Sequence, residues 1–255
     1  MHLKVIACEV AAREVYHCAA ESTNTLDIVL FTQGLHDNPD IMRERLQKAI
    51  DAQPAETFAA ILLGYGLCNN GVVGLKAGHI PMVIPRAHDC ITFFLGSKER
   101  YAEEFARQPG TYYYTSGWLE YPGRVGERVS YTPASGLAKR MALMEFIEKY
   151  GEENGRHLFE SQSQWEVNYT HGAFVGFPFL AHLGFEERVR EICREKDWEY
   201  VALAGDLTLV RDWLDGRWDD ERFLIVQPGQ EIVARYDDRI VACRNCPSAD
   251  ADGTG

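Results

Sequence analysis

The sequence ILLGYGLCNNGVVGL at residues 61–75 decides the predicted fold, together with PMVIPRAHDCITFFLGS at residues 81–97. Each stretch opens with a short apolar run bounded by glycine or proline, which is typical of a buried strand. Reactive residues follow the runs directly: Cys68 after the first, His88 and Cys90 after the second. The carboxyl ends of parallel strands form one edge of a sheet, where ligands bind. The spacing therefore predicts that these side chains converge.

The same pattern continues on both sides of these stretches. Strands are predicted at 4–9, 26–31, 58–64 and 81–85. Helices are predicted at 10–20 and 39–52, and a short one is predicted just after the glycine-rich turn. One long helix is predicted within 88–108. Strands that alternate with helices over short connections indicate a parallel, doubly wound sheet. The predicted fold class is α/β with a Rossmann-like, specifically flavodoxin-like, sheet.

The second half of the chain repeats strand and helix patterns less regularly. Strands are predicted at 110–115, 200–204 and 223–226, helices at 137–150, 186–196 and 206–214, and an antiparallel hairpin at 231–243. This recurrence predicts two similar lobes that face a cleft: an N-terminal lobe at 1–109 and a second α/β lobe at 110–247. Residues 248–255 have the composition of a disordered tail.

Length, charge and composition exclude several classes of protein. The 255 residues, 46% hydrophobic and 25% charged, suffice for one large core or two modest ones. The net charge of −12 repels a phosphate backbone, which disfavours nucleic-acid binding. No apolar run approaches the roughly 20 residues that span a bilayer, and the first residues lack the features of a secretion signal. We expect a cytoplasmic protein without membrane contact.

The chain has seven cysteines, and an odd number in a protein expected in the cytoplasm argues against a disulfide framework. Cys18 and Cys193 lie on apolar faces of predicted helices, where a free thiol behaves as a small buried hydrophobe. Cys243 and Cys246 form a single C-x-x-C pair at the end of the predicted hairpin. Such a pair alone is a weak signal for a metal or redox site, and we assign it no function.

The residues predicted to meet at the sheet edge have the chemistry of a soft-metal site. Zinc prefers thiolate and imidazole ligands, so Cys68, His88 and Cys90 are the predicted metal ligands. Three protein ligands leave a fourth position for water or a substrate, as in catalytic zinc sites. A thiol bound there would be held as thiolate. The alternative to a metal site is that all three residues have structural roles. Cys68 would then pack in a tight turn, His88 would cap the following helix and Cys90 would face the core.

Two carboxylates and one arginine lie beside these ligands in the sequence. Glu9, which follows Cys8 at the end of the first predicted strand, and Asp89 are the predicted catalytic residues. The alternatives for Asp89 are that it is itself a metal ligand, that it orients His88 or that it caps the following helix. Arg86 is a candidate for neutralising a substrate carboxylate.

The glycines before and after Cys68 have a separate interpretation. Gly64, Gly66 and Gly71 belong to a loop that follows a strand and is predicted to open a helix. Backbone amides at such a junction hold carboxylates or phosphates, so these glycines are the predicted cofactor-binding residues. The loop matches neither the dinucleotide-binding fingerprint nor the P-loop. In the alternative interpretation, its glycines let the backbone that carries Cys68 approach neighbouring segments closely.

Several phrases of the sequence resemble one family along nearly the whole chain. They are KVIACE (4–9), QGLHDNP (33–39), the two stretches quoted first, GTYYYTSGW (110–118) and GDLTLVRDWLDGRWDDERFLIVQPG (205–229). They resemble domain-of-unknown-function family 1638, which has no settled activity. Genes for members of that family often lie beside genes for corrinoid-dependent methyltransferases. The resemblance therefore implies a role in methyl transfer or one-carbon metabolism, with a corrinoid protein as a partner.

A second, looser similarity implies the same setting. Zinc methyltransferases that move a methyl group from a corrinoid to a thiol use a His-x-Cys pair and a distant cysteine, and His88 and Cys90 match that pair. Here the third thiol, Cys68, lies upstream, and the predicted fold is not a (β/α)₈ barrel. The similarity implies a zinc-dependent enzyme that acts on a small-molecule substrate or a thiol.

Three other functions remain open from the sequence. Cysteines at strand ends also hold Fe–S clusters, which gives an Fe–S protein as the alternative to zinc. A module that binds a metal or a corrinoid without turnover is the second alternative. Thiol redox chemistry without any metal is the third.

Overall fold

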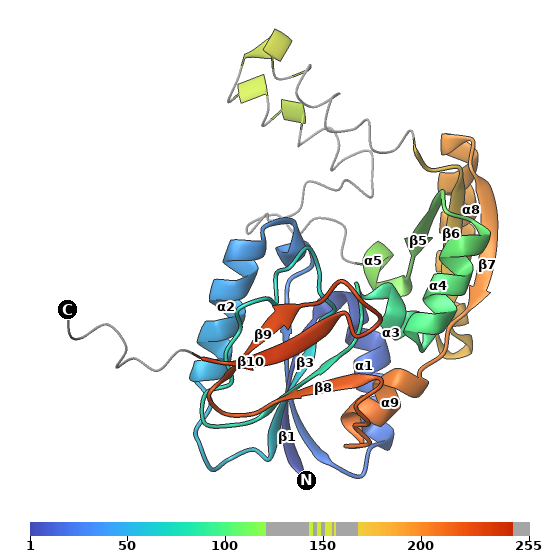
Figure 1. The fold of residues 1–255 in the computed structure, drawn as a ribbon. Helices are drawn as coiled ribbons and strands as arrows, with labels where there is room; N and C mark the ends of the chain where they lie inside the picture. Colours follow the sequence, from blue (N-terminus) through green and yellow to red (C-terminus); the bar gives the residue numbers. More distant parts are fainter. Residues whose placement is uncertain (121–142, 145–146, 149–150, 155, 157–167, 247–255) are drawn as a thin grey trace.

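A five-stranded sheet forms the centre of the computed structural model (Figure 1). The structure describes residues 1–120, 143–144, 147–148, 151–154, 156 and 168–246. The strand order in this larger sheet is β2-β1-β3-β4-β8. Its strands are β1 (His2–Cys8), β2 (Thr25–Phe31), β3 (Ala60–Gly64), β4 (Met82–Pro85) and β8 (Phe223–Val226). The first four run parallel, and β8 pairs antiparallel with β4.

Both faces of the larger sheet are covered, because its central strands are apolar on both sides. Leu3, Val5 and Ala7 of β1 pack in one core cluster with α1 (Ala12–Glu21) and α9 (Thr208–Leu214), while Ile6 packs in a second. The second cluster includes residues of α2 (Pro39–Asp51) and of a hairpin formed by β9 (Gln230–Ala234) and β10 (Val241–Asn245). Burial on both faces is the reason these strands read as continuous apolar runs.

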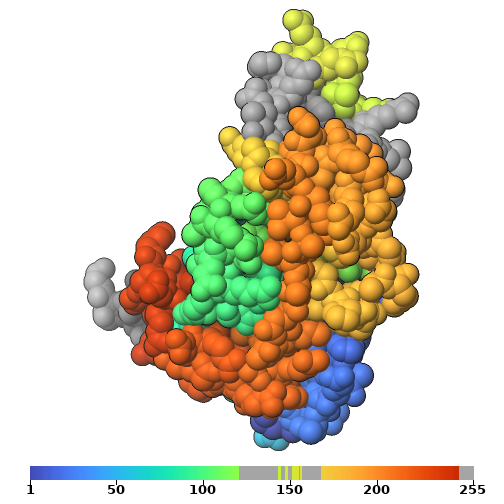
Figure 2. Space-filling view, turned by 90° about the vertical axis from the view of Figure 1, so that its right-hand side faces the viewer, coloured from blue at the N-terminus to red at the C-terminus, as the bar shows by residue number. Residues whose placement is uncertain are grey.

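A smaller, three-stranded parallel sheet stands beside the larger one (Figure 1). It has the order β5-β6-β7, with β5 (Thr111–Tyr114), β6 (His171–Gly176) and β7 (Glu199–Ala204). Helix α8 (Phe185–Lys196) packs on β6 and β7. Figure 2 shows one face of the molecule. On it, α4 (Lys98–Arg107, green) lies between the β9–β10 hairpin (red) and the part of the chain that contains α8 and β7 (orange).

The other elements within residues 1–120 and 169–246 are short. They are α3 (Ile91–Leu95), α5 (Ser116–Glu120) and the 3₁₀ turns η1 (Glu9–Ala11), η2 (Leu35–Asp37) and η4 (Pro178–Leu183). Helix α5 follows β5 and contacts η1, so it joins the end of the smaller sheet to the end of β1. Among the described helices, none is both long and apolar enough to cross a membrane.

The predicted α/β class is confirmed, as is the hairpin near the C-terminus. A fully parallel, doubly wound sheet is not what forms, because the edge strand β8 is antiparallel. This strand comes from the second half of the chain and joins the sheet built by the first half. The division into lobes at 1–109 and 110–247 stays a prediction, and the predicted tail at 248–255 lies outside the described residues.

Two helix predictions near the site are wrong. The single helix expected within 88–108 is two helices, since Gly96 adopts a left-handed φ of 85° after α3 and Ser97 then caps α4 by accepting a hydrogen bond from the Arg100 amide. The short helix expected after the glycine-rich turn is a series of turns. Cys68, Asn69 and Asn70 all have positive φ there, which is incompatible with a right-handed helix.

Candidate functional site

Three cysteines from three strand ends line one small pocket at the carboxyl edge of the larger sheet. Cys8 is the last residue of β1, Cys68 follows β3, and Cys90 lies between β4 and α3. We call this cavity the thiol pocket; its lining residues are Cys8, Val10, Leu35, His36, Gly64, Tyr65, Cys68, Cys90 and Trp118. The predicted convergence of Cys68 and Cys90 is therefore present, and Cys8 joins them.

Backbone hydrogen bonds hold two of the three loops against each other. The Leu67 amide donates to the Ala87 carbonyl at 2.8 Å, and the Cys68 amide donates to the His88 carbonyl at 3.0 Å. Gly66 makes this approach feasible, because a Cβ there would stand 2.7 Å from the Asp89 nitrogen. The position of Cys68 relative to Cys90 is thus fixed by the main chain.

The other two predicted cofactor-binding glycines also face protein atoms. A Cβ on Gly64 would stand 2.5 Å from the Ala7 Cβ, and one on Gly71 would stand 2.5 Å from the Met42 sulfur. The loop opens no helix, so the helix N-terminus on which the predicted anion site depended is missing. The structure supports the close-approach interpretation of this loop.

The imidazole of His88 is not part of the thiol pocket. His88 is exposed and does not line the cavity; its backbone carbonyl alone takes part in joining the loops. A different histidine, His36 in η2, lines the pocket in its place. Its ring lies 3.2 Å from the Asp37 carboxylate. Of the predicted ligands, Cys68 and Cys90 are brought together and His88 is not.

The sulfurs share a cavity without forming a finished coordination site. In the described part of the chain, no three His, Cys, Asp or Glu side chains are arranged as a group that could hold a metal ion. All three pocket cysteines are free thiols and half-buried.

Desolvation controls the protonation of the three thiols. Burial raises the pKa of Cys8 and of Cys68 to about 12, and it raises the pKa of Cys90 well above its usual value. The charge of Asp89 adds to this effect at Cys68 and Cys90. The thiols are neutral at physiological pH and are poor nucleophiles without a group that stabilises thiolates.

The two predicted catalytic carboxylates lie beside the pocket and do not line it. Asp89 accepts hydrogen bonds from the Ile91 amide at 2.9 Å and from the Tyr101 hydroxyl at 2.8 Å, so both its oxygens are engaged. Burial raises the pKa of this carboxyl. Glu9 is buried and accepts a hydrogen bond from the Gln33 amide at 2.9 Å. In this arrangement both residues fix the backbone around the cysteines.

Two aromatic residues of the pocket were not among the predicted site residues. Tyr65 is 4% exposed, and its hydroxyl has no hydrogen-bond partner among the described residues. Trp118 comes from α5 and donates from its indole nitrogen to the Tyr112 hydroxyl at 3.2 Å. Tyr65 sits inside the glycine-rich loop, which was the signal available. Trp118 reaches the pocket on α5, from a segment far along the chain from the three cysteines.

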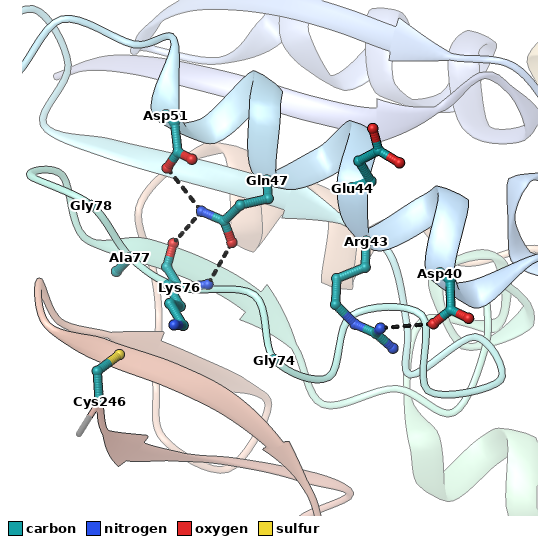
Figure 3. Close-up of a pocket in the computed structure, with 10 residues that line it drawn as sticks. All are labelled: Asp40, Arg43, Glu44, Gln47, Asp51, Gly74, Lys76, Ala77, Gly78 and Cys246. Carbon is teal, nitrogen blue, oxygen red and sulfur yellow. Dashed lines mark hydrogen bonds and ion pairs between the residues drawn. The ribbon is translucent and has the colours of Figure 1, made fainter. Parts of the chain in front are cut away.

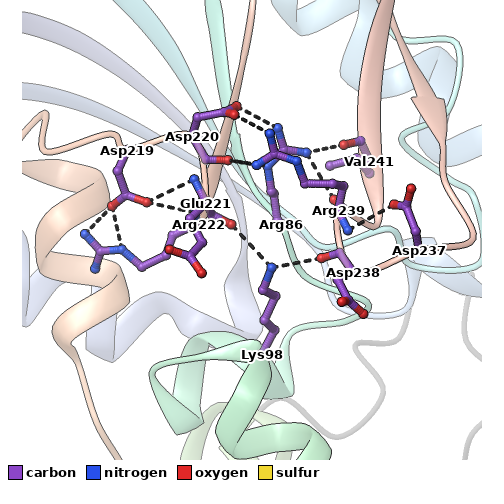
Figure 4. Close-up of polar contacts among 10 residues, drawn as sticks. All are labelled: Arg86, Lys98, Asp219, Asp220, Glu221, Arg222, Asp237, Asp238, Arg239 and Val241. Carbon is purple, nitrogen blue, oxygen red and sulfur yellow. Dashed lines mark hydrogen bonds and ion pairs between the residues drawn. The ribbon is translucent and has the colours of Figure 1, made fainter.

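Arg86 has a structural role that replaces the predicted one. Its guanidinium is buried, forms an ion pair with Asp220 at 2.9 Å and donates to the Asp220 and Val241 carbonyls (Figure 4). Arg239 reaches the same Asp220 carboxylate from the hairpin. Arg86 therefore ties the end of β4 to the hairpin, and its charge is already neutralised by protein groups.

A wider groove on another face has no comparable chemistry. It measures about 610 Å³ and lies between α2, residues 74–78 and Cys246 (Figure 3). Arg43 pairs with Asp40 at 2.9 Å, and the Gln47 amide nitrogen bonds Asp51. Cys246 is the one cysteine among the residues that line this groove, and Cys243 packs against the second core cluster. Neither residue of the C-x-x-C pair lines the thiol pocket.

One comparison with known proteins gives a match. The model of a family described as "Protein of unknown function (DUF1638)" matches residues 30–214. No curated protein and no solved structure matches the chain. The matched range contains Cys68, Cys90 and Trp118 of the thiol pocket, whereas Cys8 lies before it.

Proposed function

The chain belongs to the DUF1638 family of proteins of unknown function, and on that premise we propose that it is a metal-binding protein with zinc held by Cys8, Cys68 and Cys90. One observation carries the proposal: three separate strand ends deliver three thiols to one pocket. Soft thiolate ligands favour zinc among the common cellular metals. Cys8 takes the place that the sequence analysis gave to His88.

The enclosed surroundings of the thiols support metal binding over simple nucleophilic chemistry. With pKa values raised to about 12 at Cys8 and Cys68, the metal-free thiols hold their protons at pH 7. A bound zinc ion would supply the positive charge that stabilises the thiolates. Metal affinity should then rise with pH, because each thiol releases a proton when it binds.

We further propose an enzymatic role for the metal in one-carbon chemistry. Three protein ligands leave one position at zinc for a thiol or another small substrate, which the metal would activate. The order of the first four strands, β2-β1-β3-β4, supports a flavodoxin-like arrangement with the pocket near the switch point. Corrinoid-linked methyl transfer and a corrinoid protein as partner follow from the family resemblance, whereas the cytoplasmic location stays a prediction from the sequence.

An Fe–S cluster is the alternative cofactor at the same place. Clusters held by cysteine alone use four thiolates, whereas three cysteines line the thiol pocket. Three thiolates and one open position suit a single zinc ion. The number of thiols therefore favours zinc over the alternative cofactor.

Elemental analysis tests the proposed ligand set. The full chain is purified without oxygen or chelator as wild type and as Cys8→Ser, Cys68→Ser, Cys90→Ser, His88→Ala and Cys243→Ser. The expected result is about one zinc per chain in wild type, His88→Ala and Cys243→Ser, and at least a tenfold loss of zinc in the other three. Circular dichroism of each variant establishes that it folds.

Other outcomes would contradict specific parts of the proposal. Loss of zinc in His88→Ala would restore the original ligand set and remove Cys8 from it. Iron with bound sulfide in wild type would establish the cluster alternative. Folded protein without any metal would leave the three thiols as packing groups or as redox thiols.

A further inference from the structure

We propose that two copies of this chain associate through the outer edge of β2 and join their five-stranded sheets into one continuous sheet. The inference goes beyond the proposed function and does not depend on a metal. It identifies the partner at this edge as a second copy of the same chain, related to the first by a two-fold axis at Ile28.

The position of β2 in the larger sheet is the first observation. β2 (Thr25–Phe31) stands at the end of the order β2-β1-β3-β4-β8, and among the described strands it pairs with β1 alone. A strand at the edge of a sheet offers a row of backbone amides and carbonyls to another strand. The seven residues of β2 therefore present a template for strand pairing.

The sequence of β2 lacks the features that usually protect an edge strand. Proteins commonly block such edges with lysine, proline, a bulge or a very short strand. β2 reads TLDIVLF, pairs with β1 in unbroken register, and its one charged residue, Asp27, forms an ion pair with Lys4 at 2.7 Å. The opposite edge strand, β8, has four residues and is followed closely by Pro228. Of the two edges of the larger sheet, β2 is thus the one suited to strand addition.

The side chains of β2 are self-complementary about the midpoint of the strand. Ile28 is the central residue, so an antiparallel second copy places Ile28 opposite itself. On the same face, Leu26 then lies opposite Leu30 of the second copy. These three side chains are partly buried against the core cluster that contains α1, and pairing completes their burial. On the other face, the exposed Val29 lies opposite Asp27 of the second copy.

The charge of Asp27 and the length of the strand select this register. An axis at residue 27 would place the two Asp27 carboxylates opposite each other, which is unfavourable. An axis at residue 29 would leave Thr25 and Leu26 beyond the end of the other strand. The axis at Ile28 pairs all seven residues and opposes no like charges.

Helix α1 adds an exposed aromatic side chain beside this edge. Glu21 near the end of α1 pairs with Arg211 of α9 at 3.6 Å, and Trp213 of α9 donates to the Val83 carbonyl of β4. Helix α9 therefore lies on the β4 side of α1. Tyr16 lies about 140° around the helix from Glu21, on the flank nearer β2, and its side chain is exposed. Aromatic side chains are enriched in protein interfaces, so Tyr16 extends the apolar surface that the second copy covers.

Antiparallel pairing also fixes where the two thiol pockets lie. Because β2 of one copy runs against β2 of the other, the carboxyl edges of the two sheets point in opposite directions. Each pocket is lined by one chain, so the dimer holds two complete pockets at opposite ends of the joined sheet.

Sedimentation velocity of the full chain tests the proposal at about 0.15 M salt, where charges further apart than roughly 8 Å are screened. Chain concentrations run from about 1 to 100 μM, because interfaces of standard size have micromolar or tighter affinities. The variants are Val29→Asp, Val29→Lys and, as a matched control, Ile225→Asp on the opposite edge strand β8. Val29 and Ile225 are both 38% exposed. Circular dichroism establishes that each variant folds.

Wild type and Ile225→Asp should sediment as dimers with the same dissociation constant. Val29→Asp places a carboxylate opposite Asp27 twice in each dimer, so it should raise the dissociation constant at least about fivefold. Val29→Lys places an ammonium group there instead and should associate as tightly as wild type or more tightly.

Several results would overturn the proposal or a part of it. A wild type that stays monomeric at every concentration would refute it, and so would a dimer that Val29→Asp and Ile225→Asp affect equally. Equal weakening by Val29→Asp and Val29→Lys would keep the β2 edge and refute the register about Ile28. Zinc content of the same samples reports separately on the proposed function, since no residue of β2 lines the thiol pocket.

Discussion

Glu14 of α1 gives a prediction about stability whose magnitude can be worked out from its surroundings. Its side chain is fully buried, and neither oxygen has a hydrogen-bond partner in another described residue. Burial raises the pKa of its carboxyl from 4.5 to about 7, an effect to which Glu120 adds and which Arg13 opposes. Cys18, one turn along the same helix, is the other titratable neighbour. Glu14 is thus protonated in the folded protein over a range where it ionises in the unfolded chain.

The sign of the pH dependence follows from this difference. Between pH 4.5 and 7 the folded state binds the proton that the unfolded state releases, so the free energy of unfolding falls as pH rises. Each pKa unit corresponds to about 1.4 kcal/mol. The contribution of Glu14 is complete below pH 4.5, and about 2 to 3 kcal/mol of it is lost between pH 5 and pH 8.

Replacing Glu14 by glutamine removes the titrating group and nearly preserves its shape. Chemical denaturation of wild type, Glu14→Gln and the exposed control Glu44→Gln is followed at pH 5, 6, 7 and 8. The loss of stability from pH 5 to pH 8 should be smaller in Glu14→Gln than in the other two proteins by about 2 to 3 kcal/mol. Equal losses in all three would refute the buried, unpaired carboxyl as the cause.

Two further predictions concern the scaffold of the site. Gly66→Ala should lower the free energy of unfolding by at least about 2 kcal/mol and abolish zinc binding, because its Cβ meets the backbone of Asp89. Gly78→Ala, whose Cβ would stand at an ordinary contact distance of 3.9 Å from the Asp51 carboxylate, should change neither, and an unaffected zinc content in Gly66→Ala would contradict the argument. Arg86→Met should lower the free energy of unfolding, measured by chemical denaturation, by about 3 kcal/mol, because it leaves buried carbonyls unpaired. Arg239 is half-exposed, so Arg239→Met should lower it by less than about 1 kcal/mol. Equal losses would show that the burial of Arg86 is unimportant.

The candidate site could be predicted from the sequence only as far as strand ends identify it. The apolar runs before Cys68 and Cys90 fix where strands stop, and parallel strands bring their carboxyl ends together. The prediction that His88 is a ligand rested on its distance along the chain from Cys90, which says nothing about the direction of its side chain. Residue 88 lies in a turn that points the imidazole outward and leaves its carbonyl to bond the Cys68 amide.

Local sequence patterns were enough to predict the α/β class, the position of most strands and the meeting of two thiols. Those features depend on local periodicity and on where glycine and proline interrupt it. The tertiary structure alone decided that β8 pairs antiparallel with β4 and that Trp118 closes the pocket. Both are contacts between segments far apart in the chain, which form because they bury apolar surface, and no local pattern records which distant surface a segment will cover.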